Sequence, residues 1–265
     1  MEWYVAYLLL GAFVGFFAGL FGIGGGLVMV PVLSWLFEAQ QLSGDQNLHI
    51  ALGTSMAAIL YTAASSAYTH HSHGAVNLRI VRNMIPGLLF GTLLGALFAS
   101  RIPPFHLTIF FALFVYFSAT QMLLGLKPEA TRQLPGRLGM TLAGTGIGCI
   151  SSLVSVGGGV ISVPFMLMHN VPLKQAIGTS AALGFPIALG GTAGYIVSGL
   201  MRHTLPGGTL GFVYLPALLM LAAGSMFTTP LGARATHRLP VGLLRRGFSL
   251  LLFVLATRML WKVLG

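Results

Sequence analysis

The sequence is poor in charge, above all in negative charge. It has four acidic residues, Glu2, Glu38, Asp45 and Glu129, against fourteen lysines and arginines. Charged residues make up 7% of the chain, whereas a soluble globular domain has about 25%. So few charges cannot cover the surface that a 265-residue chain would present to water. A soluble enzyme and a disordered protein are therefore excluded.

Cysteine is almost absent as well. Cys149 is the single one in the sequence, and it lies inside an apolar run, which excludes a disulfide scaffold and indicates a packing role. Apolar residues, by contrast, make up 55% of the chain. The basic residues are scattered between apolar runs instead of forming one stripe. They therefore favour membrane lipids as partners and argue against nucleic acid.

Eight apolar runs are long enough to cross a bilayer, which takes about 20 apolar residues per helix. The first run has no lysine or arginine before it and no small-residue cleavage pattern after it, so we interpret it as a membrane helix and not as a removed signal. Two further apolar stretches are too short, and each directly follows a glycine cluster, so they predict half-helices. The eight runs are Trp3–Phe21, Ile50–Ala67, Val81–Ser100, Leu107–Leu126, Leu138–Val154, Ala176–Gly199, Leu210–Thr228 and Leu243–Leu264, and the half-helices are Leu27–Phe37 and Val160–Met168.

The two halves of the chain repeat each other. The glycines Gly24–Gly26 recur 133 positions later as Gly157–Gly159, and the Gly-Thr-Ser motif at 53–55 recurs 125 positions later at 178–180. Near the end of each half the offset is 137 positions. Matched glycine, proline and hydroxyl positions are not explained by shared hydrophobicity, so the pattern indicates an internal duplication.

The repeat predicts an all-α polytopic membrane protein built as one membrane domain. We expect a four-helix repeat at 1–126 and a second at 136–265, joined by the linker 127–135, each with a glycine break and a half-helix. An even number of crossings per repeat predicts that the repeats run parallel through the membrane. Both termini then share one side, and eight basic residues against six favour the cytoplasm for that side.

Each glycine cluster is a candidate anion site. Three successive glycines free the backbone to leave the helix, and the next helix opens with unpaired N–H groups. At membrane depth such groups must be buried in protein or line a wet cavity, where a helix N-terminus attracts anions. The alternative is that the glycines only allow close helix packing. Two equivalent clusters favour a substrate-binding role, and the residues concerned are Gly24, Gly25, Gly26, Gly157, Gly158 and Gly159.

The two Gly-Thr-Ser motifs supply hydroxyl groups that suit a small oxyanion. The alternative is that these hydroxyls satisfy the backbone of their own helix. One turn earlier in each repeat stands a basic residue that adds a charge, although a position at the membrane interface explains both of these better. The candidate hydroxyls are Thr54, Ser55, Thr179 and Ser180, and the basic residues are His49 and Lys174.

Motifs of catalysis and energy coupling are missing. The sequence has no phosphate-binding Gly-x-x-x-x-Gly-Lys-Ser/Thr loop, no Gly-x-Ser-x-Gly elbow and no His-Glu-x-x-His pair. The histidines at 70, 71 and 73 lack a neighbouring cysteine or carboxylate, so we predict no metal and no cofactor. None of the four acids lies inside an apolar run, which disfavours a cation pump. The polar groups left at membrane depth suit anions.

The motifs also carry a family resemblance. The segment 22–31 (GIGGGLVMVP) followed by 51–55 (ALGTS) resembles the sulfite exporter TauE/SafE family, and the second half repeats the pattern at 156–164 and 176–180. The resemblance covers nearly the whole chain. It implies an inner-membrane permease of about eight helices that moves sulfite, organosulfonates or other small organic anions without ATP. It also implies a role in the substrate path for the glycine breaks and the Thr-Ser pairs.

These observations predict a secondary transporter of a small anion, with no enzymatic activity. It would work by alternating access at the interface of the two repeats, where such transporters place their substrate site. A passive anion channel lined by the same glycine breaks is the alternative. A membrane enzyme or assembly factor is the third class, and it lacks a recognisable catalytic constellation.

Overall fold

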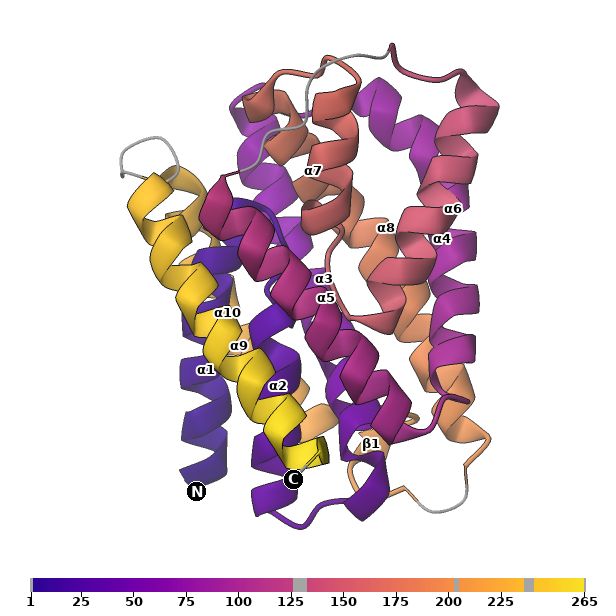
Figure 1. The fold of residues 1–265 in the computed structure, drawn as a ribbon, viewed down its shortest axis with the longest axis vertical. Coiled ribbons are helices and arrows are strands. Elements are labelled where there is room, and N and C mark those ends of the chain that lie inside the picture. The colour runs from indigo at the N-terminus through magenta and orange to yellow at the C-terminus, as the bar shows by residue number, and fades with distance from the viewer. Residues whose placement is uncertain (1, 126–132, 203–204, 236–240, 265) are drawn as a thin grey trace.

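The described residues of this computed structural model are 2–125, 133–202, 205–235 and 241–264. This part of the chain holds ten α-helices, which form one elongated bundle (Figure 1). A two-stranded antiparallel hairpin pairs Thr209 with Tyr214. The helices are α1 (Glu2–Phe21), α2 (Gly26–Ala39), α3 (Asn47–Ser72), α4 (Leu78–Ala99), α5 (Pro104–Leu124), α6 (Arg137–Leu153), α7 (Gly159–Met168), α8 (Leu173–Leu200), α9 (Leu215–Ala235) and α10 (Val241–Leu264), the strands are β1 (Thr209–Leu210) and β2 (Val213–Tyr214), and a 3-10 turn, η1, covers Gly44–Gln46.

The all-α membrane fold is confirmed. Of the described helices, seven are long and apolar enough to cross a membrane. The eighth expected crossing is α6, whose 17 residues span about 25 Å. Large apolar side chains such as Phe90, Phe117 and Val254 stay more than half exposed on the outside of the bundle, which suits a lipid environment. Both expected half-helices are present as α2 and α7.

The glycine break between α1 and α2 turns the chain back on itself. The rings of Tyr7, early in α1, and Phe37, late in α2, lie 6.2 Å apart, and Gln40 donates a hydrogen bond to the Tyr7 hydroxyl. These contacts make α2 antiparallel to α1. In the second repeat α7 likewise runs back toward the end of the bundle where α6 begins (Figure 1).

The two repeats are inverted relative to each other, so the expectation of parallel repeats is wrong. The equivalent helices α5 and α10 are antiparallel, because Tyr116 contacts Thr257 at 2.6 Å between the hydroxyl oxygens. Further along, the Arg245 guanidinium donates to the Gln121 carbonyl at 3.2 Å. The physical reason is that each half-helix reverses the chain direction. With its half-helix, each repeat reverses direction an even number of times between its first and its last helix, whereas the expectation counted the four crossings alone.

The inversion redistributes the basic residues between the two ends of the bundle. We call the end that holds the start of α1 and the end of α10 the termini side. With the helix directions above, seven described basic residues lie toward the opposite side and four toward the termini side, which reverses the majority expected from the sequence. The seven are Arg79, Arg82, Arg137, Lys174, Arg234, Arg245 and Arg246, and the four are Arg101, Arg202, Arg258 and Lys262.

The repeats also exchange helices, because α1 packs along α9 and α4 along α6. Glycines at spacings of four residues line both contacts and bring backbone against backbone. A Cβ on Gly15 would lie 2.6 Å from the Ser225 Cα, and a Cβ on Gly91 would lie 2.1 Å from the Thr145 carbonyl oxygen. Small residues that let helices approach closely are typical of membrane interfaces. The two repeats therefore form a single unit and not two separable domains.

The inverted arrangement predicts which loops face the same side of the membrane. In a variant whose Cys149 is replaced by alanine, Asp45→Cys and Lys174→Cys should react with a membrane-impermeant maleimide from opposite sides. His71→Cys should react from the same side as Lys174→Cys. Labelling of Asp45→Cys and Lys174→Cys from the same side would show that the repeats are parallel. The reason is that the α2–α3 loop and the α7–α8 loop hold equivalent positions in the two repeats.

Candidate functional site

The two glycine breaks cross each other in the centre of the bundle. A Cβ on Gly24 would lie 2.9 Å from the Gly157 Cα, and a Cβ on Gly26 would overlap the carbonyl oxygen of Ser155 at 1.5 Å. A Cβ on Gly159 would lie 2.5 Å from the Gly22 carbonyl oxygen. All of these are backbone contacts between the two repeats, which explains why glycine occupies these positions.

Both half-helices begin at this crossing. The residues that precede them, Gly25 and Gly158, have φ angles of 80° and 85°, in the left-handed region that favours glycine. Neither half-helix has a side-chain cap on its first N–H groups. The breaks are buried in protein throughout, so the positive ends of two helix dipoles converge in the interior.

A small cavity lies at the crossing. Its volume is about 10 Å³, enough for about one water molecule. Its two polar side chains both come from α3. The Thr62 hydroxyl donates to the Ile59 carbonyl at 3.2 Å, and the Ser66 hydroxyl is buried without a hydrogen-bond partner. The cavity is lined by Ala18, Gly22, Gly24, Thr62, Ala63, Ser66, Gly157, Ala181 and Gly184.

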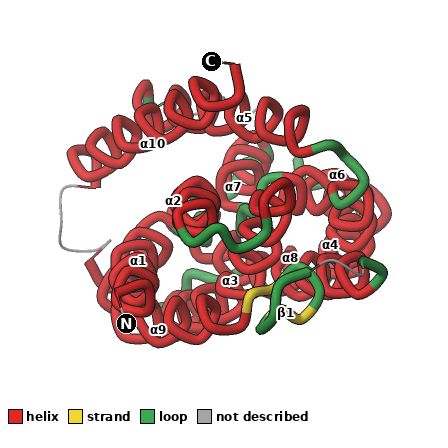
Figure 2. Tube along the Cα trace, turned by 90° about the horizontal axis from the view of Figure 1, so that it is seen from below, coloured by secondary structure: helices red, strands yellow, loops and turns green. Residues whose placement is uncertain are grey.

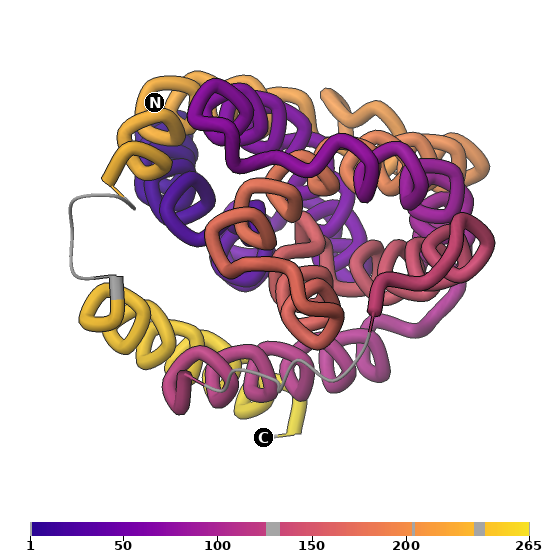
Figure 3. Tube along the Cα trace, turned by 90° about the horizontal axis from the view of Figure 1, so that it is seen from above, coloured from indigo at the N-terminus to yellow at the C-terminus, as the bar shows by residue number. Residues whose placement is uncertain are grey.

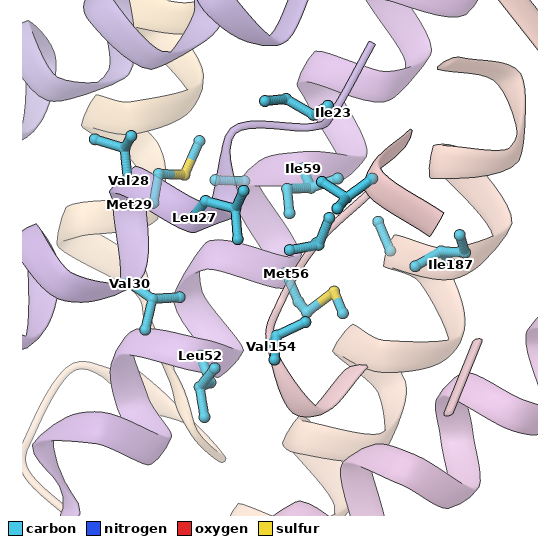
Figure 4. Close-up of a cluster of buried hydrophobic side chains, with 14 of the residues drawn as sticks. Ile23, Leu27, Val28, Met29, Val30, Leu52, Met56, Ile59, Val154 and Ile187 are labelled. Carbon is cyan, nitrogen blue, oxygen red and sulfur yellow. The ribbon is translucent and has the colours of Figure 1, made fainter. Parts of the chain in front are cut away.

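Apolar side chains surround the crossing (Figure 4). Ile23 and Val154 belong to the breaks themselves, Met56 and Ile59 come from α3, and Ile187 comes from α8, and all five are buried. Within such apolar surroundings a hydrogen bond or a dipole acts more strongly than in water. The few polar groups at the crossing therefore dominate its electrostatics.

The threonines of the Gly-Thr-Ser motifs do not line this cavity. The Thr54 hydroxyl accepts a hydrogen bond from the Tyr214 N–H, and the Thr179 hydroxyl accepts one from the Asn77 N–H, both at 2.9 Å. Each threonine thus holds a loop of the other repeat. The glycine of each motif contacts the same loop, since a Cβ on Gly53 would lie 2.4 Å from the Phe212 carbonyl oxygen, and Gly178 meets Ala75 in the same way.

The two serines of the motifs differ from each other. Ser180 donates to the carbonyl of Gly22 at 3.1 Å and so supports the first glycine break. The Ser55 hydroxyl is buried and has no hydrogen-bond partner. Neither serine is among the residues that line the cavity.

The two basic candidates lie away from the crossing. The Nε2 atom of His49 lies 3.2 Å from the Ala99 carbonyl oxygen, and the Arg202 guanidinium donates to the Ser100 carbonyl at 3.1 Å. Both side chains thus sit at the C-terminus of α4, where the helix dipole favours cations. Lys174 is exposed in the first turn of α8. No metal cluster of three or more His, Cys, Asp or Glu side chains forms among the described residues.

The sequence analysis did not predict two residues that line the cavity, Thr62 and Ser66. The sequence does contain a signal for them, because Ser55, Thr62 and Ser66 have the spacing of one helix face. The signal was weak because hydroxyl residues on a helix most often bond to their own backbone, as Thr62 does.

A comparison with protein families identifies the family of this chain. Residues 7–259 match the model of the sulfite exporter TauE/SafE family. The chain belongs to this family. No solved structure matches it.

Curated relatives of this TauE/SafE protein are named as transporters. A probable membrane transporter protein of Haemophilus influenzae is 40% identical to it over 96% of this chain and 97% of its own. The probable membrane transporter protein YdhB of Bacillus subtilis is 27% identical over 89% of this chain and 92% of its own. A probable membrane transporter protein of Methanocaldococcus jannaschii is 25% identical over 96% of this chain and 94% of its own. The chain is thus a multi-pass protein of a membrane transporter family.

The threonine contacts predict a structural effect. Thr54→Val and Thr179→Val should each lower the free energy of unfolding by about 1 kcal/mol, because each leaves a partly buried backbone N–H without its acceptor. Thermal unfolding of the purified protein in detergent measures the effect. Thr54→Ser and Thr179→Ser keep the acceptor oxygen and should retain most of the stability. Valine variants as stable as the wild type would show that these hydrogen bonds contribute nothing.

Proposed function

We propose that this protein is a secondary transporter of a small anion, and that the anion passes the crossing of the two glycine breaks. The observation that carries the proposal is that two uncapped helix N-termini begin at one buried crossing, beside a small cavity that Gly22, Gly24 and Gly157 of the breaks line. Both the N–H groups and the helix dipoles favour negative charge there. The unpartnered hydroxyl of Ser66 adds a further donor.

The distribution of acidic residues supports an anion as the substrate. Among the described residues, Glu2 begins α1, Glu38 lies near the end of α2 and Asp45 lies in the turn after it. The described membrane interior therefore carries no carboxylate that would repel an anion or relay a cation. Donors without a full charge attract an anion but release it again, which transport requires. Sulfite, an organosulfonate or another small organic anion agrees with the charge of this site and with the family.

The small size of the cavity supports a carrier more than a channel. A space for about one water molecule does not accommodate a sulfite ion, so the crossing is too narrow for this ion to pass in this conformation. Inverted repeats provide the two openings that alternating access needs, because each repeat can adopt the conformation of the other. A channel would require a continuous pore through the crossing.

Radiolabelled sulfite in proteoliposomes tests this proposal. Uptake should saturate and should be stimulated by unlabelled sulfite on the opposite side. Ser66→Ala should raise the half-saturation concentration about 3- to 10-fold, the effect of losing one hydrogen bond. Ser65→Ala, next to it and outside the cavity, is the matched control and should change nothing. Flux that is linear in concentration and carries an ohmic current would show a channel instead.

We also propose that the protein lies in the inner membrane with both termini outside the cytoplasm. The seven described basic residues opposite the termini outnumber the four beside them, and the positive-inside rule assigns the richer side to the cytoplasm. This reverses the orientation expected from the sequence, because the helix directions move Arg79, Arg82 and Arg137 to the side opposite the termini.

Labelling of intact cells tests this orientation. Asp45→Cys, on the termini side, should react with an impermeant maleimide added outside, whereas Lys174→Cys should react only after the cells are opened. The reverse pattern would place both termini in the cytoplasm.

A further inference from the structure

Two larger pockets accompany the half-helices. Helices α5 and α10 form a separate layer beside the rest of the bundle (Figures 2 and 3). Between this layer and α7 lies a pocket of about 150 Å³, which we call the α7 vestibule. Along α2 lies one of about 460 Å³, which we call the α2 vestibule. Both are large enough for several water molecules, unlike the central cavity.

The two vestibules are equivalent under the inverted repeat. The α2 vestibule contains Pro31 of α2, and the α7 vestibule contains its counterpart Pro164 of α7. The α7 vestibule also reaches the crossing, since Ile23 and Gly159 line it. With α2 and α7 running toward opposite sides of the bundle (Figure 1), one vestibule lies toward the termini side and the other toward the opposite side.

Each vestibule contains one arginine, and the equivalent position in the other vestibule holds a neutral polar side chain. The α7 vestibule has Gln121 from α5 and Arg245 from α10. The α2 vestibule has Arg258 at the position equivalent to Gln121, and Thr108 at the position equivalent to Arg245. The offset of 137 residues relates both pairs. The two halves thus differ in sequence at these positions, yet each vestibule keeps one guanidinium group.

Arg245 has donors left over for a ligand. Its side chain is partly buried and donates to the Gln121 carbonyl oxygen. A guanidinium group has five N–H donors and a permanent charge. No described carboxylate pairs with it, since the one ion pair in the described structure joins Lys262 and Glu38. A partly buried cation without a counter-ion favours an anion beside it.

Arg258 is the arginine of the vestibule on the termini side, and unlike Arg245 it is exposed. Its guanidinium lies over the Trp35 ring, 4.7 Å from the centroid. In the same vestibule Lys262 and Glu38 contact each other at 2.5 Å, so these two charges compensate one another. The charge of Arg258 is therefore the one that remains for a ligand, and the ring of Trp35 fixes its position.

We propose that Arg245 and Arg258 are anion-binding residues of two vestibules, one on each side of the central crossing. The proposal rests on the proposed function and adds its entry and exit subsites. An anion from one side would first bind the arginine of the open vestibule, then pass the helix N-termini at the crossing, and then meet the second arginine. Placing the full charges in the vestibules and uncharged donors at the crossing selects anions without trapping them in the centre.

Sidedness of sulfite transport tests this assignment. Uptake of radiolabelled sulfite is measured in proteoliposomes with the substrate added on one defined side at a time. Arg245→Gln should raise the half-saturation concentration about tenfold or more from the side opposite the termini, because charge-assisted hydrogen bonds are lost. Arg258→Gln should do so from the termini side. Arg246→Gln, an exposed neighbour with the same change of charge, should leave both values unchanged.

Further variants separate binding from folding. Arg245→Lys and Arg258→Lys keep the charge and should recover part of the affinity, while gel filtration checks that every variant is folded. Folded Arg245→Gln and Arg258→Gln proteins with the half-saturation concentrations of Arg246→Gln would overturn the assignment. So would an effect of either variant that is the same from both sides.

A binding measurement distinguishes this proposal from the transport proposal. Sulfite added to the protein in detergent should raise the unfolding temperature of the wild type and of Arg246→Gln, but not that of the Arg245→Gln/Arg258→Gln double variant. A wild type that binds sulfite in this way but does not transport it would refute the transporter and leave the subsites supported. Equal stabilisation of the wild type and the double variant would refute the subsites alone.

Discussion

Contact of backbone with backbone at the crossing of the two glycine breaks is the constraint on which the structure depends. Gly24 meets Gly157, and Gly26 lies against the carbonyl of Ser155, at distances that leave no room for a Cβ. This contact brings the starts of α2 and α7 together in the interior. Because the breaks also reverse the chain, the same glycines determine the direction of each repeat and the place where the two repeats meet.

The exchange of helices between repeats follows from the same use of glycine. In α1 and α4, glycines every four residues let α9 and α6 approach until backbone atoms touch. The bilayer offers no hydrophobic gain for bringing two helices together, so close packing of this kind supplies the association instead. The glycines of this chain therefore serve helix packing in α1 and α4 and form the proposed substrate site at the crossing.

Charged groups and uncharged hydrogen-bond donors occupy different parts of the proposed path. Full charges lie in the outer vestibules, at Arg245 and Arg258, whereas the centre has helix N-termini and a serine hydroxyl. A charged residue at the centre would be costly in the membrane interior and would hold an anion too firmly. The threonines of the Gly-Thr-Ser motifs belong to neither region, because their hydroxyls accept hydrogen bonds from backbone N–H groups of the opposite repeat.

The sequence by itself determined the membrane environment, the ten helical segments and the duplication, because these depend on composition, run length and recurring glycines. It also located both glycine breaks. The inversion of the repeats could not be predicted, because a half-helix that continues a crossing and one that reverses it have the same sequence pattern. Only the tertiary structure decided that direction, through contacts such as Tyr7 with Phe37 and Tyr116 with Thr257. It thereby decided which side holds each charge and that Thr62 and Ser66, not Thr54 and Thr179, line the central cavity.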